Sequence, residues 1–316
     1  MVSRALSQHL GQGRAAPMET ALLILPNFLI ILLGLVLARR FDFGRDFWDG
    51  LEKLVYYVLF PALLFRALAI ARIDFSAAGA LIAAALAFTL AGFALSLAAG
   101  PLFGLDRKLL ATGSQCGYRF NTYVGLAVAG SVFGTPGVAL AALLLGVMIP
   151  LANVLAVAML AAHGSRGFLH ELATHPLVMS SLAGLAWNVA GLPLPGFADQ
   201  TLNLLGTTAL PAGLLTVGAA MRIEAGQGPA AAHAWWLAVK LFAVPAVAWA
   251  LAGALGFTGL DAKILLLCAA LPTATNAYIL AVRMAGDGRA VATQVTIGTL
   301  LSMATIPAWL ALPLAT

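Results

Sequence analysis

Two polar stretches interrupt apolar segments of the chain and contain the residues best suited to bind a solute. The first reads GSQCGYRFNTYVG around Asn121, and the second reads LPTATNAYIL around Asn276. Pro272 lacks a backbone donor and clashes with the preceding turn, so a helix through the second stretch must break there. In lipid, such a break is tolerated only where protein or water satisfies the freed backbone groups. We therefore expect both breaks to lie inside the protein.

The chemistry that these breaks offer is recognition of an anion. The N-terminus of a half-helix presents unpaired N–H groups and the positive end of the helix dipole, which favour a carboxylate. The side-chain amides of Asn121 and Asn276 can donate to the same group. The sequence thus predicts a substrate-binding site at these two asparagines. Hydroxyl groups that could add donors to it belong to Thr122, Tyr123, Thr273, Thr275 and Tyr278.

Arg119 lies two positions before Asn121, and an arginine at such depth is costly unless it faces water or a counter-charge. It either attracts the anion directly, or instead extends toward the membrane surface or pairs structurally. Both alternatives stay open, because its repeat equivalent is the uncharged Ala274. The asparagines also have a second interpretation, in which they only cap broken helices or join neighbouring helices. We favour substrate binding because the two positions repeat across the chain.

The elements that position these residues must cross a membrane. Of the 316 residues, 62% are hydrophobic and only 9% are charged. An ordinary soluble domain carries about 25% charged residues. Uncharged stretches long enough to cross a hydrocarbon core of about 30 Å recur along the chain. The composition therefore predicts an all-α integral membrane protein.

Apolar runs between charges and Gly/Pro punctuation predict ten transmembrane helices. A polar tail, residues 1–17, precedes the first of them, and neither a signal peptide nor a cleavage site is indicated. Arg66 and Lys240 fall within apolar runs and are expected to extend toward the membrane surface. The predicted helices span 20–38, 53–71, 76–100, 108–132, 137–162, 172–191, 200–221, 231–255, 262–284 and 290–313.

Basic residues gather in alternate connections between these helices. The first, third, fifth, seventh and ninth connections hold most of the lysines and arginines. Short loops rich in these residues stay in the cytoplasm. With an even number of helices, both termini are then expected outside, in a multi-pass protein of a bacterial inner membrane.

An internal repeat relates the two halves of the chain. The segment FPALLFRALAIARID, ending at Asp74, parallels LPAGLLTVGAAMRIE, ending at Glu224, with an offset of 150. Further on, GLDRKLL and NTYVGLAVAG match GLDAKIL and NAYILAVRMAG with an offset of 155. Helices keep register while loops change length, so a slowly drifting offset indicates two related halves.

The repeat predicts two five-helix halves, residues 18–163 and 164–316. An odd number of crossings per half inverts the second half relative to the first, and two inverted repeats with broken helices are typical of secondary transporters. Helices four and nine would be the broken crossover helices. Prolines expected to form hinges or kinks are Pro61, Pro211, Pro272, Pro150 and Pro307.

Other functions lack their motifs. HELATH spaces its histidines five apart, whereas a zinc protease needs four, and no phosphate loop exists. We expect no enzyme, catalytic residue, metal site or cofactor, and the scattered basic residues argue against a nucleic-acid partner. Long stretches without Asp or Glu argue against a proton relay or sodium site built on paired carboxylates.

The sequence resembles the auxin efflux carrier family, whose bacterial members include malonate and malate permeases. The resemblance rests on LPNFLIILLG, VLFPALLF, RFNTYVGLA, IPLANVLAV and LPTATNAYILA, and covers nearly the whole chain from Met18. It implies ten helices in two inverted repeats, with a scaffold and a transport domain each drawn from both repeats. It also implies a homodimer, and asparagines at the crossover that contact the substrate carboxylate, here Asn121 and Asn276.

The expected function is secondary transport of a small organic anion by alternating access at the crossover of helices four and nine. The substrate would be a mono- or dicarboxylate such as malonate or malate, or an auxin-like weak acid. The connection between helices five and six is short, so regulation through a long loop is not implied. The alternative is a sodium-coupled symporter or a cation/proton antiporter of the same architecture, and coupling to protons or sodium stays open.

Overall fold

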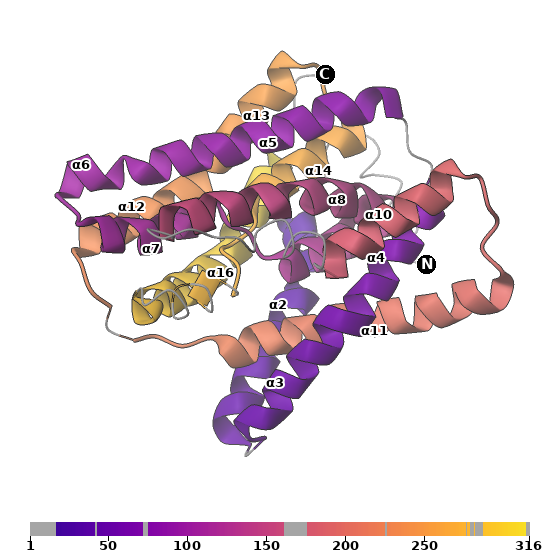
Figure 1. Cartoon of the computed structure of the whole chain (residues 1–316), viewed down its shortest axis with the longest axis horizontal. Coiled ribbons are helices and arrows are strands. Elements are labelled where there is room, and N and C mark those ends of the chain that lie inside the picture. Colours follow the sequence, from indigo (N-terminus) through magenta and orange to yellow (C-terminus); the bar gives the residue numbers. More distant parts are fainter. Residues whose placement is uncertain are drawn as a thin grey trace.

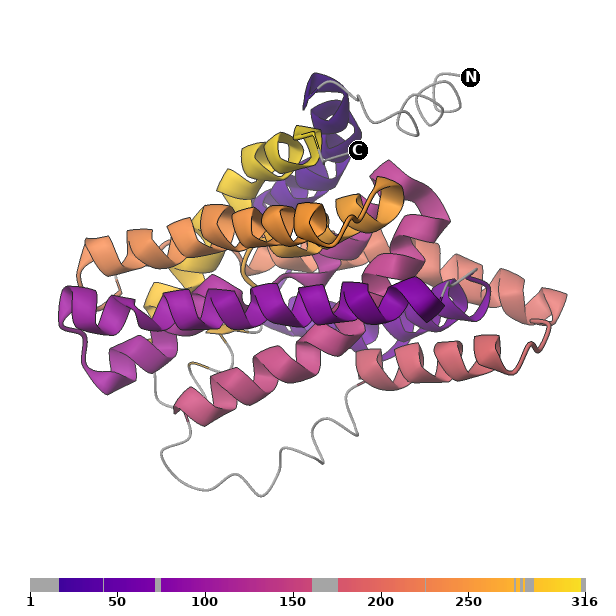
Figure 2. The same cartoon turned by 90° about the horizontal axis from the view of Figure 1, so that it is seen from above.

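The computed structural model describes residues 17–41, 43–71, 75–160, 176–224, 226–275, 277–278, 281 and 287–313. Within these ranges the regular elements are all helices, as predicted, and they pack into one body (Figures 1 and 2). The helices are α2 (Pro17–Arg40), α3 (Arg45–Leu54), α4 (Phe60–Ala69), α5 (Phe75–Leu97), α6 (Ala99–Phe103), α7 (Arg107–Tyr118), α8 (Thr122–Leu160), α10 (Pro176–Val189), α11 (Gly196–Ala220), α12 (Ala230–Ala238), α13 (Val244–Ala254), α14 (Gly259–Ala270) and α16 (Gly288–Ala311). Two π-helical turns, η1 (Val55–Leu59) and η2 (Val239–Ala243), join α3 to α4 and α12 to α13.

Six helical stretches in the described part of the chain are long and apolar enough to cross a membrane. They are Met18–Arg40, Ala78–Phe103, Arg107–Ala156, Gly196–Ala220, Ala230–Ala254 and Gly288–Ala311. The prediction of a polytopic all-α membrane protein is therefore supported. The count of ten crossings and the inverted relation of the halves stay predictions.

The stretch Arg107–Ala156 is too long for one crossing. Its 50 residues would extend about 75 Å at 1.5 Å per residue, against a hydrocarbon core of about 30 Å. Two interruptions divide it. The first is the break at residues 119–121, and the second is a kink at Gly134, where φ is 65° and ψ is −157°. The kink lies between the predicted segments 108–132 and 137–162.

One face of α2 exposes large apolar side chains. Leu22 and Leu29 are 61% and 53% exposed, whereas Ile24 and Ile31 on the opposite face are buried. Exposed leucines spaced two turns apart would be costly in water but suit a lipid environment.

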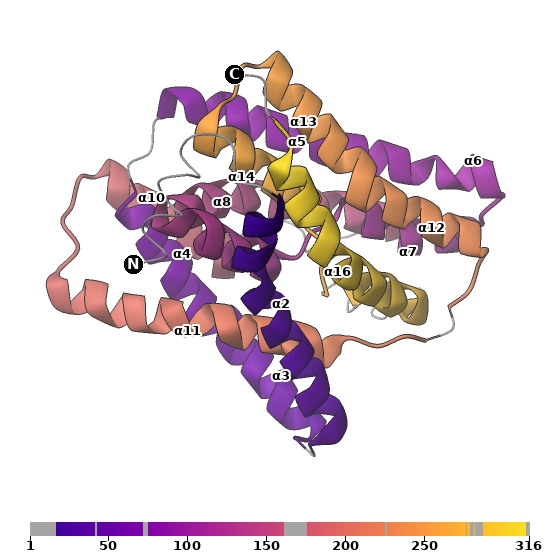
Figure 3. The same ribbon diagram turned by 180° about the vertical axis from the view of Figure 1, so that it is seen from behind.

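The helices pack in two groups with α8 between them. One group contains α2, α4, α10 and α11, and the other contains α5, α7, α13 and α14 (Figure 1). Viewed from above, α5 runs beside α12 and α13 (Figure 2), and from behind, α2 crosses α16 (Figure 3). Each group draws on both predicted halves of the chain, and the assignment of a scaffold and a transport domain stays a prediction.

Arg66 forms an ion pair with Asp199 in the first turn of α11, and its location at the membrane surface stays a prediction. Its Nε and Nη2 donate to the two carboxylate oxygens of Asp199 at 2.7 and 3.1 Å, joining α4 to α11. Sequence reasoning missed this pair because the partners lie 133 positions apart.

We expect Arg66→Gln to lower the free energy of unfolding by about 1 kcal/mol, since the bond is bidentate but water screens it. The measurement is thermal melting of the purified protein in a double-mutant cycle with Asp199→Asn. Arg107→Gln, which alters an exposed arginine, is the matched control. Additive effects of the two substitutions would contradict the prediction.

Candidate functional site

The first break separates α7 from α8 at residues 119–121. The backbone of Arg119 is extended there, with φ −73° and ψ 154°. Asn121 then starts α8, because its Oδ1 accepts hydrogen bonds from the N–H groups of Tyr123 at 3.0 Å and Val124 at 3.2 Å. This N-cap satisfies donors that the first helical turn leaves without a backbone partner.

The second break follows α14, which ends at Ala270. Residues 271–274 are non-helical, and Pro272 within them has no N–H to continue the helix. A turn at Thr275 and the helical residues 277–278 follow, and the N–H of Tyr278 donates to the carbonyl of Thr275 at 3.1 Å. Asn276 lies outside the described residues, so its role stays a prediction.

The two breaks lie against each other. The N–H of Asn121 donates to the carbonyl of Pro272 at 2.8 Å, and Thr273 Oγ1 donates to the carbonyl of Cys116 at 2.6 Å. Residues more than 150 positions apart therefore satisfy backbone groups that the breaks set free, as a buried helix interruption requires. We call this contact, residues 115–123 with 269–275, the crossover.

Small residues allow the crossover to close. A Cβ atom added to Gly125 would lie 2.7 Å from Leu271 Cδ1, and one added to Gly117 would lie 2.0 Å from Ser96 Oγ. The glycines thus bring α8 and α7 into close contact with their neighbours, as small residues do in helix packing within membranes.

Three buried donors remain at the first break without a hydrogen-bond partner among the described residues. They are Asn121 Nδ2, Gln115 Nε2 and the hydroxyl of Tyr118. The Asn121 assignment follows from chemistry, because Oδ1 must face the two N–H groups it accepts from, which turns Nδ2 away from them. A buried donor without a partner is costly, so it marks a place where another group binds.

Arg119 is buried, with 5% of its surface exposed. Its Nη2 donates to Asn153 Oδ1 at 3.1 Å and its Nη1 to Gln115 Oε1 at 3.4 Å. These amides orient the guanidinium beside the first break. Sequence reasoning did not assign roles to Gln115, Tyr118 or Asn153, although the first two lie in the polar stretch GSQCGYRFNTYVG and Asn153 lies in the motif IPLANVLAV.

The predicted hydroxyl donors have different surroundings. Thr273 is engaged with Cys116, so its hydroxyl joins the two breaks. Tyr123 stacks on Phe60 of α4 with ring centroids 4.6 Å apart, so it lies between the two packing groups. Thr122 begins α8 and is half-buried, and Thr275 ends the second break. The structure therefore places all of these residues at or beside the crossover.

The predicted hinge prolines lie in three kinds of position. Pro61 begins α4 directly after the π-turn η1, and Pro272 lies in the second break. The helices α8, α11 and α16 continue through the other three, Pro150, Pro211 and Pro307. Their role as hinges stays a prediction.

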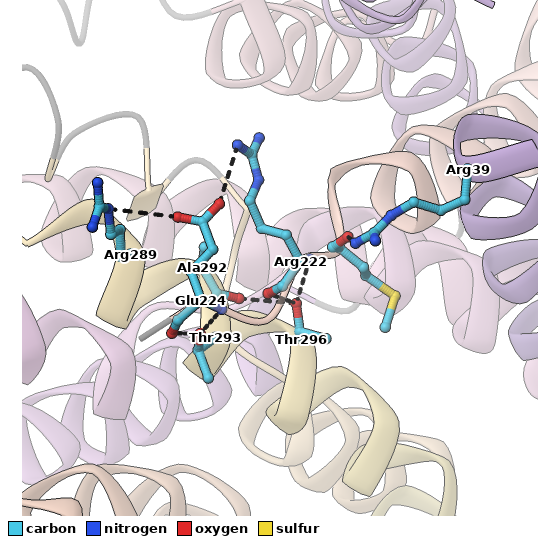
Figure 4. A network of polar contacts seen from close by, with 8 residues as sticks. Arg39, Arg222, Glu224, Arg289, Ala292, Thr293 and Thr296 are labelled. Atoms are coloured by element: carbon cyan, nitrogen blue, oxygen red, sulfur yellow. Dashed lines mark hydrogen bonds and ion pairs between the residues drawn. The ribbon is translucent and has the colours of Figure 1, made fainter. Parts of the chain in front are cut away.

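A polar network lies beside the crossover, where the segment after α11 runs along α16 (Figure 4). Thr296 Oγ1 accepts from the N–H of Arg222 at 2.9 Å and lies 2.8 Å from its carbonyl oxygen. Thr293 makes the same pair of contacts with Glu224, at 2.9 and 2.7 Å. The two threonine hydroxyls thus hold an extended segment against a helix.

Charged side chains extend this network toward the predicted site. Glu224 lies 3.9 Å from Arg222 and 4.0 Å from Arg289, and Arg39 donates to the carbonyl of Met221 at 3.2 Å (Figure 4). The guanidinium of Arg222 lies 4.8 Å from the ring centroid of Tyr278. Two arginines beside Glu224, and a third that contacts the neighbouring Met221 carbonyl, leave a positive balance among the charged side chains of this network. The signal available in the sequence was the repeat of Arg72 and Asp74 as Arg222 and Glu224, which served only to align the halves.

Comparisons with known proteins agree with this architecture. The profile of a family described as "Membrane transport protein" matches residues 159–310. A "Putative malonate transporter" of Rhizobium meliloti is 27% identical over 306 residues, which cover 90% of this chain and 92% of that protein. An "Uncharacterized transporter" of Methanothermobacter thermautotrophicus is 25% identical over 300 residues, with coverage of 92% and 96%.

The helical architecture, the candidate membrane spans and these relatives together define a multi-pass membrane transport protein. Within that class, the resemblance seen in the sequence is confirmed: the chain is related, at low identity, to the auxin efflux carrier family.

Proposed function

We propose that this chain is a secondary transporter that moves a small organic anion through alternating access at the crossover. The observation that carries the proposal is Asn121 Nδ2, a buried amide donor without a hydrogen-bond partner among the described residues, where two broken helices meet. A carboxylate oxygen is the acceptor that such a donor, beside a helix N-terminus, binds best.

The charges around the crossover support an anionic substrate. The buried guanidinium of Arg119 lies two positions before Asn121, and the guanidinium of Arg222 lies 4.8 Å from the ring centroid of Tyr278, which follows the second break. The α8 N-terminus adds the positive end of its dipole. A mono- or dicarboxylate such as malonate or malate fits these groups, and the name of the Rhizobium relative makes malonate the first probe.

The location of the crossover supports alternating access. The helix α8 touches both packing groups, and Tyr123 in its first turn stacks on Phe60 of α4, which belongs to the first group. If the groups are a scaffold and a transport domain, a shift of one against the other would change which membrane face reaches Asn121. Inverted repeats, a homodimer and external termini belong to the same proposal.

Uptake of radiolabelled malonate into proteoliposomes that contain the full chain tests this function. We expect uptake that saturates with malonate concentration and is competed by malate, because the substrate must occupy a specific site before each cycle. Uptake should also exceed that of protein-free liposomes at least about tenfold. A thermal-shift series of mono- and dicarboxylates on the purified protein would rank the substrates.

Flux equal to that of protein-free liposomes for every carboxylate that stabilises the protein would refute carboxylate transport. Flux that rises linearly with concentration would indicate a passive pore instead of a carrier.

A further inference from the structure

Lys240 is buried deep in a membrane-spanning stretch. Only 1% of its surface is exposed, and it lies in η2, near the middle of Ala230–Ala254. The expectation from sequence that it extends toward the membrane surface is therefore wrong. A cation held at this depth is costly unless a defined partner stabilises it.

Its partner is the end of a broken helix. Lys240 Nζ donates to the carbonyl of Ala269 at 3.1 Å, in the last turn of α14. The last carbonyls of a helix have no partner within the helix and form the negative end of its dipole. Pro272 cannot offer an N–H to them. The lysine thus brings a positive charge to the negative end of α14, directly before the second break.

The local structure fixes this lysine in place. Its π-turn packs against α14, α7, α5 and α16, and π-turns inside α-helices are frequent at functional sites. Trp309 Nε1 donates to the carbonyl of Leu241 at 2.9 Å, which ties the turn to α16. On the other side, Val239 Cγ1 would lie 3.3 Å from a Cβ atom on Gly117.

The two breaks now show the same electrostatic arrangement built from different residues. At the first, Arg119 directly follows α7 and places a buried cation at its C-terminal end. The repeat equivalent of Arg119 is the uncharged Ala274. Lys240 supplies the missing positive charge from a neighbouring helix, so each half-helix ends beside a buried cation.

We propose that Lys240 is a positioning residue that serves as a built-in cation for the end of α14. In transporters with broken helices, half-helix C-termini and unwound carbonyls coordinate the coupling Na⁺. Here a tethered ammonium takes that place, so the crossover is completed without Na⁺ at this end. The expected change in the affinity for malonate rests on the proposed function, whereas the electrostatic role of Lys240 does not.

Melting of the purified full-length protein in NaCl, ethylammonium chloride or choline chloride at equal ionic strength tests this role. Wild-type Tm is expected to agree within about 1 °C in the three salts. Lys240→Ala is expected to melt about 5 °C lower in choline, because an uncompensated helix end is left buried. Na⁺ or ethylammonium, which are small enough to reach the vacated position, should restore at least half of that shift.

Lys263→Ala is the matched control. Lys263 Nζ also donates to helix-terminal carbonyls, those of Leu310 and Leu312 at 2.6 and 3.2 Å, but it is only half-buried. Water can replace its ammonium, so its melting should not depend on which cation is present. Selective recovery in Lys240→Ala alone supports the proposal, and a loss that no cation restores would overturn it.

A wild-type Tm that is clearly higher in NaCl than in choline chloride would also overturn the proposal, and this measurement needs no variant.

If Lys240→Ala fails to fold, Lys240→Arg and Lys240→Gln decide. The Kd for malonate should stay within about threefold for arginine and weaken about tenfold for glutamine, since only arginine keeps the charge. Equal affinities would refute the role of charge. The salt series contains no substrate, so its outcome is independent of whether carboxylate transport is found.

Discussion

Asn121→Ser is expected to reduce malonate uptake about 30-fold while the protein stays folded. Serine is also a good N-cap, so its hydroxyl can accept from the N–H groups of Tyr123 and Val124 that Asn121 now caps. What serine lacks is the amide donor that we assign to the substrate. Loss of a hydrogen bond to a charged group costs about 2 kcal/mol, which corresponds to about 30-fold.

The measurement is the initial rate of malonate uptake into proteoliposomes, with melting temperature as the measure of folding. Asn188→Ser is the matched control, because Asn188 Nδ2 already donates to the carbonyls of Leu68, Ala69 and Ala71. This control should lose stability but keep its uptake rate. Uptake at the wild-type rate in Asn121→Ser would remove the amide from the proposed site.

The internal repeat carries the same expectation for Asn276→Ala. If the two halves contribute equivalent donors, the two single substitutions should weaken uptake by similar factors. A defect in only one of them would show that the halves bind the substrate unequally.

Gly218→Ala is expected to destabilise the protein by about 3 kcal/mol through a backbone clash. A Cβ atom at this position would lie 1.8 Å from the carbonyl oxygen of Ile31, and one at Gly34 would lie 2.2 Å from that of Leu215. The helices α2 and α11 therefore touch backbone to backbone, and neither can yield by a change of rotamer. Their separation would also disturb the group that includes α4 and α10.

Gly253→Ala provides a control with the opposite sign. A Cβ atom there meets no atom within 4 Å, and the residue is helical and exposed. Alanine is the better helix former by about 1 kcal/mol, so this variant should melt at or slightly above the wild-type temperature. Both purified variants are compared by thermal melting. Equal changes in Tm for Gly218→Ala and Gly253→Ala would contradict the close contact of α2 with α11.

The breaks could be read from sequence because their causes are local. Pro272 stops a helix wherever it lies, and Asn121 with Thr122 is typical of a helix start. Helix breaks at these positions are confirmed by the structure. The cap formed by Asn121 shows that the structural interpretation of this residue was also correct for its oxygen, while its nitrogen has no partner among the residues that the structure describes.

The roles of Arg66 and Lys240 could not be read in this way. The sequence did not reveal the partner of either charge, because each partner is distant in the chain. Asp199 is 133 positions from Arg66, and Ala269 is 29 positions from Lys240. A backbone carbonyl as partner leaves no mark on the sequence at all. Single charges in apolar runs therefore need the tertiary contacts before a role can be assigned.

The sequence by itself determined that the protein lies in a membrane, that it is helical, and where its two helix breaks lie. These features depend on apolar runs and on proline, whose effects are confined to their own segment of the chain. It also indicated the family, through motifs spread over both halves. Only the tertiary structure decided that the breaks touch, that the amide nitrogen of Asn121 has no hydrogen-bond partner in the described part of the chain, and that Lys240 ends beside α14. These depend on contacts between residues distant in the chain, where the close packing permitted by glycines fixes which backbone groups meet.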